Sequence, residues 1–196
     1  MFVIEPCAVK ECTRYAITGS DLCYFHIEHK EKYVSERIGV IKNRERVTNL
    51  RGSFVRISDL DFSKKRFHAC SCSHAYFENM NFSGCNFRLC FFDFAEFKNC
   101  SFKECDMKFT VFAGSTMTSC DFSGSDILHS NFNGVRALDC RFDDSDLYFS
   151  CFINSNLDSV SFRDCNLKRV SFGFSTRNEV SFKYSNYEEA EFEDKP

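Results

Sequence analysis

The 196-residue sequence contains no tryptophan, and it has no uninterrupted run of 18 apolar residues. The second absence predicts that no helix of the chain crosses a membrane. The N-terminus, MFVIEPCAVK, lacks the basic stretch followed by an apolar stretch that is typical of a secretory signal peptide. The net charge of −3 indicates neither nucleic acid nor a bare membrane surface as a partner. We therefore expect a soluble, cytoplasmic protein.

The sequence also lacks a Gly-rich phosphate loop and any spacing that would pair a nucleophile with a base, so we expect no enzymatic activity. Thirteen cysteines in a chain without an export signal favour reduced thiols or metal ligands over disulfides. The segment HACSCSH could bind a metal weakly through His68 and His74. Cys70 and Cys72 within it, however, fall on inward-facing positions of the repeat described next.

Phenylalanine, in contrast, is abundant and periodic. Seventeen of the 25 phenylalanines lie between Phe62 and Phe192 at multiples of five residues from Phe62, and no insertion breaks this register between Ile57 and Phe192. Five residues of a helix advance about 500°, and an odd step along a strand inverts the face, so neither element keeps these centres on one side. The chain must turn once per repeat, as in a solenoid. The other centres are mostly Met107, Met117, Ile127, Leu147, Leu157, Leu167 and Tyr187.

Small residues lie two positions before most centres, and eight of the ten cysteines after residue 57 belong to this second series. We interpret these cysteines as small apolar residues of the core rather than as redox or metal-binding groups. They are Cys70, Cys85, Cys90, Cys100, Cys105, Cys120, Cys140 and Cys165.

The centres also indicate how many repeats make one coil. From Phe102 onward, phenylalanine alternates with other residues, so the pattern has a period of ten and each coil contains an even number of repeats. Four repeats make a coil of 20 residues with four faces. Phenylalanines then form two opposite walls of the core, and Met and Leu close the sides. One wall contains Phe62, Phe82, Phe102, Phe122, Phe142, Phe162 and Phe182, and the other contains Phe92, Phe112, Phe132, Phe152 and Phe172.

The repeating unit, a small residue, then Asp or Asn, then Phe or Leu, then two variable residues, occurs as CDFSG, SDLYF, SNLDS and CNLKR. It resembles the pentapeptide-repeat family over roughly residues 57–194. The resemblance implies an all-β solenoid for residues 57–196, a right-handed quadrilateral β-helix of about seven coils. At strand spacing of about 4.8 Å, the rod would be on the order of 30 Å long. The resemblance is to bacterial proteins, and it implies a non-catalytic rod.

Residues 1–26 precede the repeats and contain the spacing Cys7-x4-Cys12-x10-Cys23-x2-His26. Three thiolates and one imidazole satisfy tetrahedral zinc and leave no open position for catalysis. The segment resembles small treble-clef-like zinc modules, which implies a structural zinc ion that stabilises a short unit. His29 competes with His26 as the fourth ligand.

Residues 27–56 connect the two parts. Ile27, Val34, Ile38 and Ile41 fall on one helical face, which predicts an amphipathic helix between residues 27 and 47. An open end of a β-solenoid exposes core residues and unpaired backbone groups, so we expect the helix to cap the first coil. The alternative is a basic helix that contacts nucleic acid or a partner.

The outward positions suggest where a protein partner binds. On the face that contains Leu147, successive coils present apolar and aromatic side chains that together would form an exposed patch, the alternative being scattered apolar surface residues. The predicted patch contains Leu89, Phe109, Leu128, His129, Tyr148 and Phe149. The C-terminal end is a second candidate surface, because the four residues after Phe192 are too few to cover the last coil. The uncapped end predicts either an end-to-end homodimer or a further segment downstream.

An alternative function is a DNA-mimicking binder of a type II topoisomerase, since some relatives in the resembling family bind these enzymes in place of DNA and confer quinolone resistance. Residues 58–196 carry 15 basic and 21 acidic residues. An acidic stripe contains Asn86, Asp106, Asp126, Asp146 and Asn166. These side chains could equally cap the turns of each repeat. Because lysines and arginines interrupt the exterior, we expect non-catalytic binding of an unidentified protein rather than mimicry.

Overall fold

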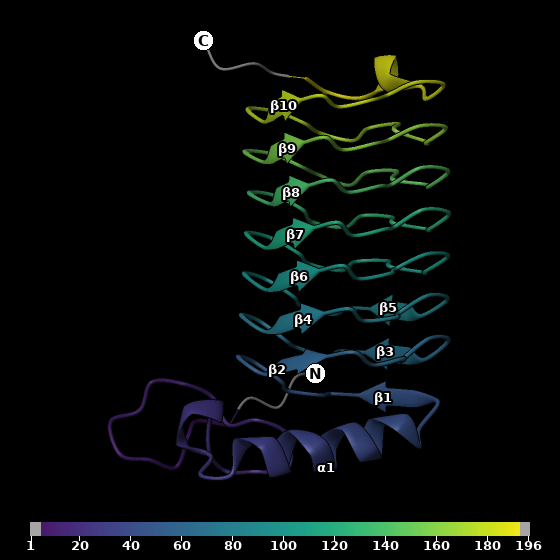
Figure 1. The fold of residues 1–196 in the computed structure, drawn as a ribbon. Helices are drawn as coiled ribbons and strands as arrows, with labels where there is room; N and C mark the ends of the chain where they lie inside the picture. The colour runs from purple at the N-terminus through teal and green to yellow at the C-terminus, as the bar shows by residue number, and fades with distance from the viewer. Residues whose placement is uncertain (1–4, 193–196) are drawn as a thin grey trace.

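The computed structural model describes residues 5–192 as a straight rod with a small unit and a helix at its base (Figure 1). The N-terminal part contains η1 (Tyr24–His26) and α1 (Lys30–Lys42). The rod contains ten short strands: β1 (Arg46–Thr48), β2 (Arg56–Ser58), β3 (Arg66–His68), β4 (Tyr76–Glu78), β5 (Asn86–Arg88), β6 (Glu96–Lys98), β7 (Thr116–Thr118), β8 (Arg136–Leu138), β9 (Asn156–Asp158) and β10 (Thr176–Asn178). A 3-10 helix, η2 (Tyr187–Glu189), follows them.

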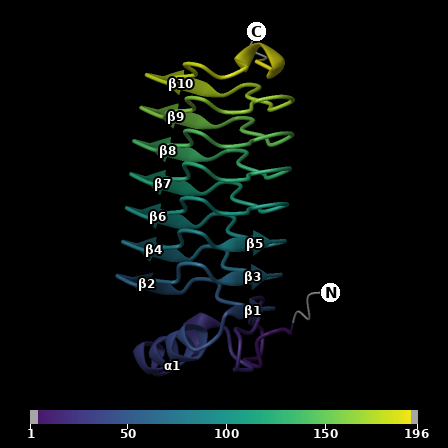
Figure 2. The same ribbon diagram turned by 90° about the vertical axis from the view of Figure 1, so that its right-hand side faces the viewer.

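Every strand pairs in parallel with the strand one coil away. Arg46 of β1 pairs with Arg66 of β3, and Arg56 of β2 pairs with Tyr76 of β4, so one coil contains 20 residues. One sheet has the order β1-β3-β5 and the other has the order β10-β9-β8-β7-β6-β4-β2. Isolated parallel bridges with the same spacing continue the remaining faces. Figure 2 shows the coils stacked one above another along the rod. The expected right-handed solenoid of about seven coils, with four repeats per coil, is confirmed.

The core consists of phenylalanine columns that meet edge to face. Phe102 and Phe122 stack with ring centroids 4.7 Å apart, and Phe102 meets Phe112 of the opposite wall nearly at a right angle. All three side chains are fully buried. Parallel stacking within a wall and edge-to-face contact between walls are both favourable arrangements for aromatic rings. The two predicted phenylalanine walls are therefore present.

The small residues of the second series do more than fill space. Ser125 Oγ donates a hydrogen bond to the carbonyl oxygen of Phe102, and Cys105 Sγ lies 3.1 Å from that of Phe82. The interval is 23 residues in both cases, so each bond joins neighbouring coils. A thiol is a weaker donor than a hydroxyl, but both are small enough for the corner. The cysteines predicted to be small core residues are buried, and several also act as donors toward the previous coil.

Two expectations about the ends of the rod are wrong in detail. The helix begins at Lys30 and continues through Gly39, so Ile27 precedes it and does not belong to its apolar stripe. The capping role holds, because Ile41 is buried and Ile38 packs against the core of the rod. At the other end, Tyr187 was expected to be a core centre but is exposed, since the chain leaves the repeat there to form η2.

Candidate metal centre and exposed aromatic ladders

Four potential metal ligands meet in the N-terminal unit. Cys7 Sγ lies 3.3 Å from His26 Nδ1, Cys23 Sγ lies 3.4 Å from the same nitrogen, and Cys12 Sγ lies 3.9 Å from Cys23 Sγ. All four ligand atoms fall within 4.8 Å of one another. The residues predicted from the spacing are therefore assembled as one group that could hold a metal ion.

Local structure explains why these residues converge. An antiparallel bridge between Pro6 and Tyr15 folds the segment back on itself, and a turn from Val9 to Cys12 brings Cys12 beside Cys7. Cys23 immediately precedes η1 and His26 ends it, so a single 3-10 turn carries two ligands. His29 lies beyond this turn, at the start of α1, and is not a member of the group.

The distances suit a tetrahedral ion. With metal–sulfur bonds of about 2.3 Å and metal–nitrogen bonds of about 2.0 Å, tetrahedral geometry requires ligand–ligand separations of roughly 3.4–3.8 Å. The three measured separations lie between 3.3 and 3.9 Å. Three sulfurs and an imidazole nitrogen form a closed set of four ligands, which is typical of a structural site rather than a catalytic one.

The thiols of the group differ in their tendency to ionise. Burial opposes ionisation of Cys7, but hydrogen bonds from the Cys23 amide and from His26 outweigh it and lower the pKa of the thiol to about 6. Burial raises the pKa of Cys23. The thiolate is the form of cysteine that binds metals. The lowered pKa therefore favours the metal-binding form of Cys7 near neutral pH.

The second cysteine–histidine segment does not form such a group. Cys70 and Cys72 are buried inside the rod, whereas His74 lies on the outside. Burial raises the pKa of Cys72 well above its ordinary value. Among residues 5–192, no second group of three or more potential metal ligands was found.

The N-terminal unit is fastened to the rod by contacts that the sequence did not reveal. The Arg51 amide donates to Thr18 Oγ1 at 2.6 Å, and the Thr18 amide donates to the Arg51 carbonyl at 2.9 Å. The Arg51 guanidinium forms an ion pair with Glu5, and the Tyr33 hydroxyl donates to the Thr18 carbonyl. Burial raises the pKa of Tyr33 to about 12. Thr18 thus connects the metal-ligand unit to both the helix and the first coil.

The predicted surface patch forms a continuous column of rings, which we call the first ladder and define as Phe109, His129 and Phe149. Phe109 and His129 stack at 5.3 Å, and His129 and Phe149 stack at 5.2 Å. Tyr148 meets both His129 and Phe149 edge to face. Phe109 and Phe149 are each 47% exposed, and Leu89 continues the column one coil below. Leu128 lies beside it, partly buried.

A second ladder, which the sequence analysis missed, contains Phe54, His74 and Phe94. His74 stacks between the two phenylalanines, with centroid distances of 4.8 and 5.2 Å. The signal was available, because all three lie two residues after a centre at intervals of 20. Beside this ladder, a groove of about 490 Å³ separates the rod from the N-terminal unit, and its lining includes Tyr15 and Tyr24.

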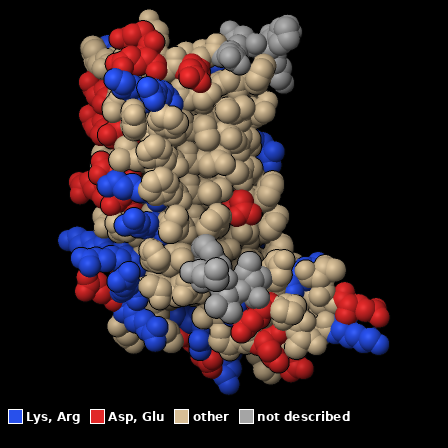
Figure 3. Space-filling view, turned by 180° about the vertical axis from the view of Figure 1, so that it is seen from behind, with Lys and Arg blue, Asp and Glu red and all other residues tan. Residues whose placement is uncertain are grey.

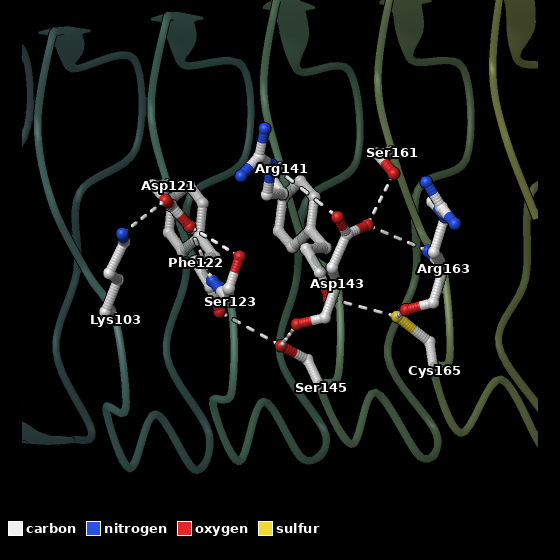
Figure 4. Close-up of polar contacts among 11 residues, drawn as sticks. Lys103, Asp121, Phe122, Ser123, Arg141, Asp143, Ser145, Ser161, Arg163 and Cys165 are labelled. Atoms are coloured by element: carbon white, nitrogen blue, oxygen red, sulfur yellow. Dashed lines mark hydrogen bonds and ion pairs between the residues drawn. The ribbon is translucent and has the colours of Figure 1, made fainter.

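Several charged side chains on the other faces are engaged with their neighbours. Lys103 pairs with Asp121, and Asp143 accepts hydrogen bonds from the Arg163 amide and from Ser161 (Figure 4). In the acidic stripe, Asp106 and Asp126 both lie within 4 Å of Lys108. Asp146 accepts from the Tyr148 amide, as expected for a turn-capping side chain.

Comparison with known families agrees with this geometry. The family profile "Pentapeptide repeats (8 copies)" matches residues 70–108, and the profile "Pentapeptide repeat region" matches residues 115–192. The chain belongs to the pentapeptide-repeat family. A search of curated protein sequences found no match.

Solved pentapeptide-repeat structures resemble the chain at a distance. A pentapeptide-repeat protein, Rfr23, from the cyanobacterium Cyanothece 51142 is 10% identical, with 81% of this chain and 99% of that chain covered and a TM-score of 0.39. Full-length QnrB1, a plasmid-mediated fluoroquinolone resistance protein, is 18% identical over 75% of this chain and 81% of that chain, with a TM-score of 0.33. HetL from Nostoc sp. strain PCC 7120, involved in heterocyst differentiation regulation, is 10% identical over 74% and 84%, with a TM-score of 0.27. No function is carried over from these distant likenesses.

Within the described part of this pentapeptide-repeat chain, no helix has the length and hydrophobicity needed to cross a bilayer. The two ladders and the metal-ligand group are the candidate functional sites among residues 5–192.

Proposed function

We propose that the protein is a non-catalytic rod that binds another protein through the first ladder. The observation that carries this proposal is the exposure of Phe109 and Phe149, each 47%, in register with His129 on successive coils. A contiguous patch of exposed aromatic side chains marks a contact site, because its burial by a partner removes apolar area from water.

The geometry of the ladder indicates what it can contact. Each ring stacks on the next one along the rod, so the ring faces cover each other and the ring edges point outward. The upper face of Phe149 already holds the guanidinium of Arg169 at 5.5 Å. A partner therefore meets a rigid ridge of ring edges, which favours apolar contact without a large loss of side-chain entropy.

A capture experiment with purified, tagged protein in extract of its own organism tests the proposal. The double variant Phe109→Glu, Phe149→Glu should lose the captured protein, and Tyr184→Glu should retain it. Tyr184 is also exposed and also has a positive φ, so it is a matched control. Glu104 occupies the same repeat position with φ of 56°, which shows that glutamate is tolerated there. Equal capture by both variants would contradict the proposal.

We also propose that Cys7, Cys12, Cys23 and His26 hold a structural zinc ion. The ligand separations and the closed set of three sulfurs and one nitrogen support this assignment. Metal analysis should find about one equivalent of zinc per chain, reduced in Cys7→Ser and Cys23→Ser but not in Cys151→Ser, which changes a cysteine on the rod. Less than about half an equivalent in the unaltered protein would reject zinc.

Topoisomerase binding by DNA mimicry remains an untested alternative, and we do not adopt it. The acidic stripe includes two asparagines, and Lys108 lies against two of its three aspartates.

An end-to-end homodimer and a cytoplasmic location also remain predictions. At the C-terminal end, Arg177 points into the coil, donates to the Phe172 carbonyl and lies over the Phe192 ring. Residues 193–196 lie outside the described part of the chain.

A further inference from the structure

One side of the rod differs from the others in having no charged side chains over three successive coils. This uncharged face is formed by FTVFAG (109–114), HSNFNG (129–134) and FSCFIN (149–154). It lies on the side of the centres Phe112, Phe132 and Phe152, and Figure 3 shows a broad expanse without charge on that side of the rod. The 53 charged residues of the chain lie elsewhere.

The face is also low and even. Between the first ladder on one edge and the column of Phe94 and Phe174 on the other, the outward residues are small or of medium size. Gly114 and Gly134 leave one edge without side chains, and the Gly134 Cβ position would meet only the Gly114 backbone. Backbone groups here are paired between coils, as in the bond from the Gly114 amide to the Asn133 carbonyl. The surface therefore offers contact area rather than unsatisfied hydrogen bonds.

We infer that the uncharged face associates with the same face of a second copy of this chain. In a two-fold pair each patch meets itself, so a face that carries columns of one charge would repel its copy, and this face does not. A second copy also has the same coil spacing of about 4.8 Å, so one good contact between coils recurs along the whole interface. The inference extends the proposed binding role of the first ladder, which forms one edge of this face, and it rests on that role.

Charges at the borders favour rods that run in opposite directions. The nearest charged residue below the face is Asp93, and the nearest above it on the ladder edge is Arg169. In an antiparallel pair the Asp93 end of each copy meets the Arg169 end of the other. A parallel pair would bring like charges together, which is unfavourable.

The size of the face sets the strength of the pair. Together with the two bordering coils that contain Asp93 and Arg169, the contact spans five coils, from Leu89 to Phe174, which are about 24 Å tall. One side of five residues is about 16 Å wide, so the footprint is on the order of 400 Å² per copy. The pair would bury on the order of 800 Å² in total, which is below the roughly 1,000 Å² expected of a stable specific interface, so the association is weak and transient. We therefore expect a reversible dimer with a dissociation constant in the micromolar range.

Sedimentation equilibrium of the full, metal-loaded chain tests the inference. The unaltered protein should form dimers, and Ile153→Arg should raise the dissociation constant by about tenfold or more. Leu138→Arg is the matched control on a neighbouring face, since Leu138 also follows a centre directly and is exposed. Arg88 and Arg163 occupy the same repeat position, so arginine is compatible with the fold. Both variants should keep the thermal midpoint of the unaltered protein.

Three outcomes overturn the inference. They are a monomer up to about 200 μM, equal weakening by Leu138→Arg, and a dimer that Ile153→Arg leaves intact, as an end-to-end dimer would be. For the antiparallel orientation, Asp93→Lys and Arg169→Glu should each weaken the dimer, and the double variant should restore it; lack of restoration overturns that orientation. A monomer that still captures a different protein through Phe109 and Phe149 overturns the inference and leaves the proposed function standing.

Discussion

Ser125 Oγ donates a 2.9 Å hydrogen bond to the carbonyl oxygen of Phe102, which lies 23 residues earlier in the chain and one coil away. The Ser125 hydroxyl oxygen also accepts a hydrogen bond from the Cys105 amide at 3.0 Å. A single small side chain thus joins two coils while it occupies a corner of the core. The inward columns therefore hold the rod together, and the outward columns are left to interact with other molecules.

The corner bonds predict a difference between two buried serines. Ser125→Ala should lower the free energy of unfolding by about 1–3 kcal/mol, because it leaves the Cys105 amide without its side-chain acceptor and removes the bond to Phe102. Ser115 Oγ is equally buried but has no hydrogen-bond partner among the described residues. Ser115→Ala should therefore cost less or stabilise the protein in urea denaturation. Equal losses would show that the bonds do not contribute.

A second prediction concerns Gly114, whose φ is +68°. A Cβ atom there would lie 2.6 Å from the Phe94 ring, so Gly114→Ala combines left-handed strain of about 1–2 kcal/mol with a steric clash. Gly124 has φ of +69° but no contact shorter than 3.6 Å, so Gly124→Ala measures the strain alone. We expect Gly114→Ala to be the more destabilising substitution, and Phe94→Ala to remove the difference. If the two alanine variants are equally stable, the Phe94 ring does not exclude a Cβ atom at position 114.

The Asp121 carboxyl predicts a pH dependence. Partial burial opposes its ionisation, but hydrogen bonds from Ser123 and the nearby Lys103 ammonium lower the pKa of Asp121 below its ordinary value of 3.8. A lowered folded-state pKa stabilises the protein above pH 3.8, and this stabilisation is lost as the pH falls through the folded-state value. The unaltered protein should therefore unfold at a higher urea concentration than Asp121→Asn at about pH 6, and the gap should close in more acidic solution.

The exposed Asp139→Asn variant controls for the loss of one negative charge. A gap between the unaltered protein and Asp121→Asn that stays constant with pH would mean that the carboxylate is not the stabilising form.

Metal removal should act locally. Treatment with a strong chelator should make residues 7–26 sensitive to protease, because the short unit has little core of its own. The rod should remain resistant, since its phenylalanine core begins at Phe62 and does not include the ligands. Cys12→Ser should reproduce the sensitivity, and Cys151→Ser should not. Cleavage throughout the rod after chelation would contradict a local role for the metal.

The sequence predicted the rod well because its information is repeated. A 20-residue coil places Phe109, His129 and Phe149 in one column whatever the details of each turn, so this column could be derived before its contacts were known. The second ladder obeys the same spacing, but Phe54 and His74 lie in the first coils, where the five-residue repeat is least regular and predicts the outward side chains least well.

Features that depend on tertiary contacts could not be derived. The bond between Thr18 and Arg51 joins residues that share no pattern, and it exists only because the N-terminal unit folds against the first coil. The helix boundary at Lys30 follows from η1, which takes up the preceding residues and which hydrophobic periodicity does not predict. Tyr187 continued the five-residue register in sequence, yet the chain end allows η2 to form instead.

The division between inward residues that stabilise and outward residues that bind is tested most directly by measuring stability and partner capture on the same variants. The double variant Phe109→Glu, Phe149→Glu should keep its free energy of unfolding within about 0.5 kcal/mol of the unaltered protein, and it should lose the captured partner. Phe112→Leu, which changes a fully buried ring, should lower the stability and keep the partner while the protein remains folded. Full capture by the ladder variant at unchanged stability would contradict the account.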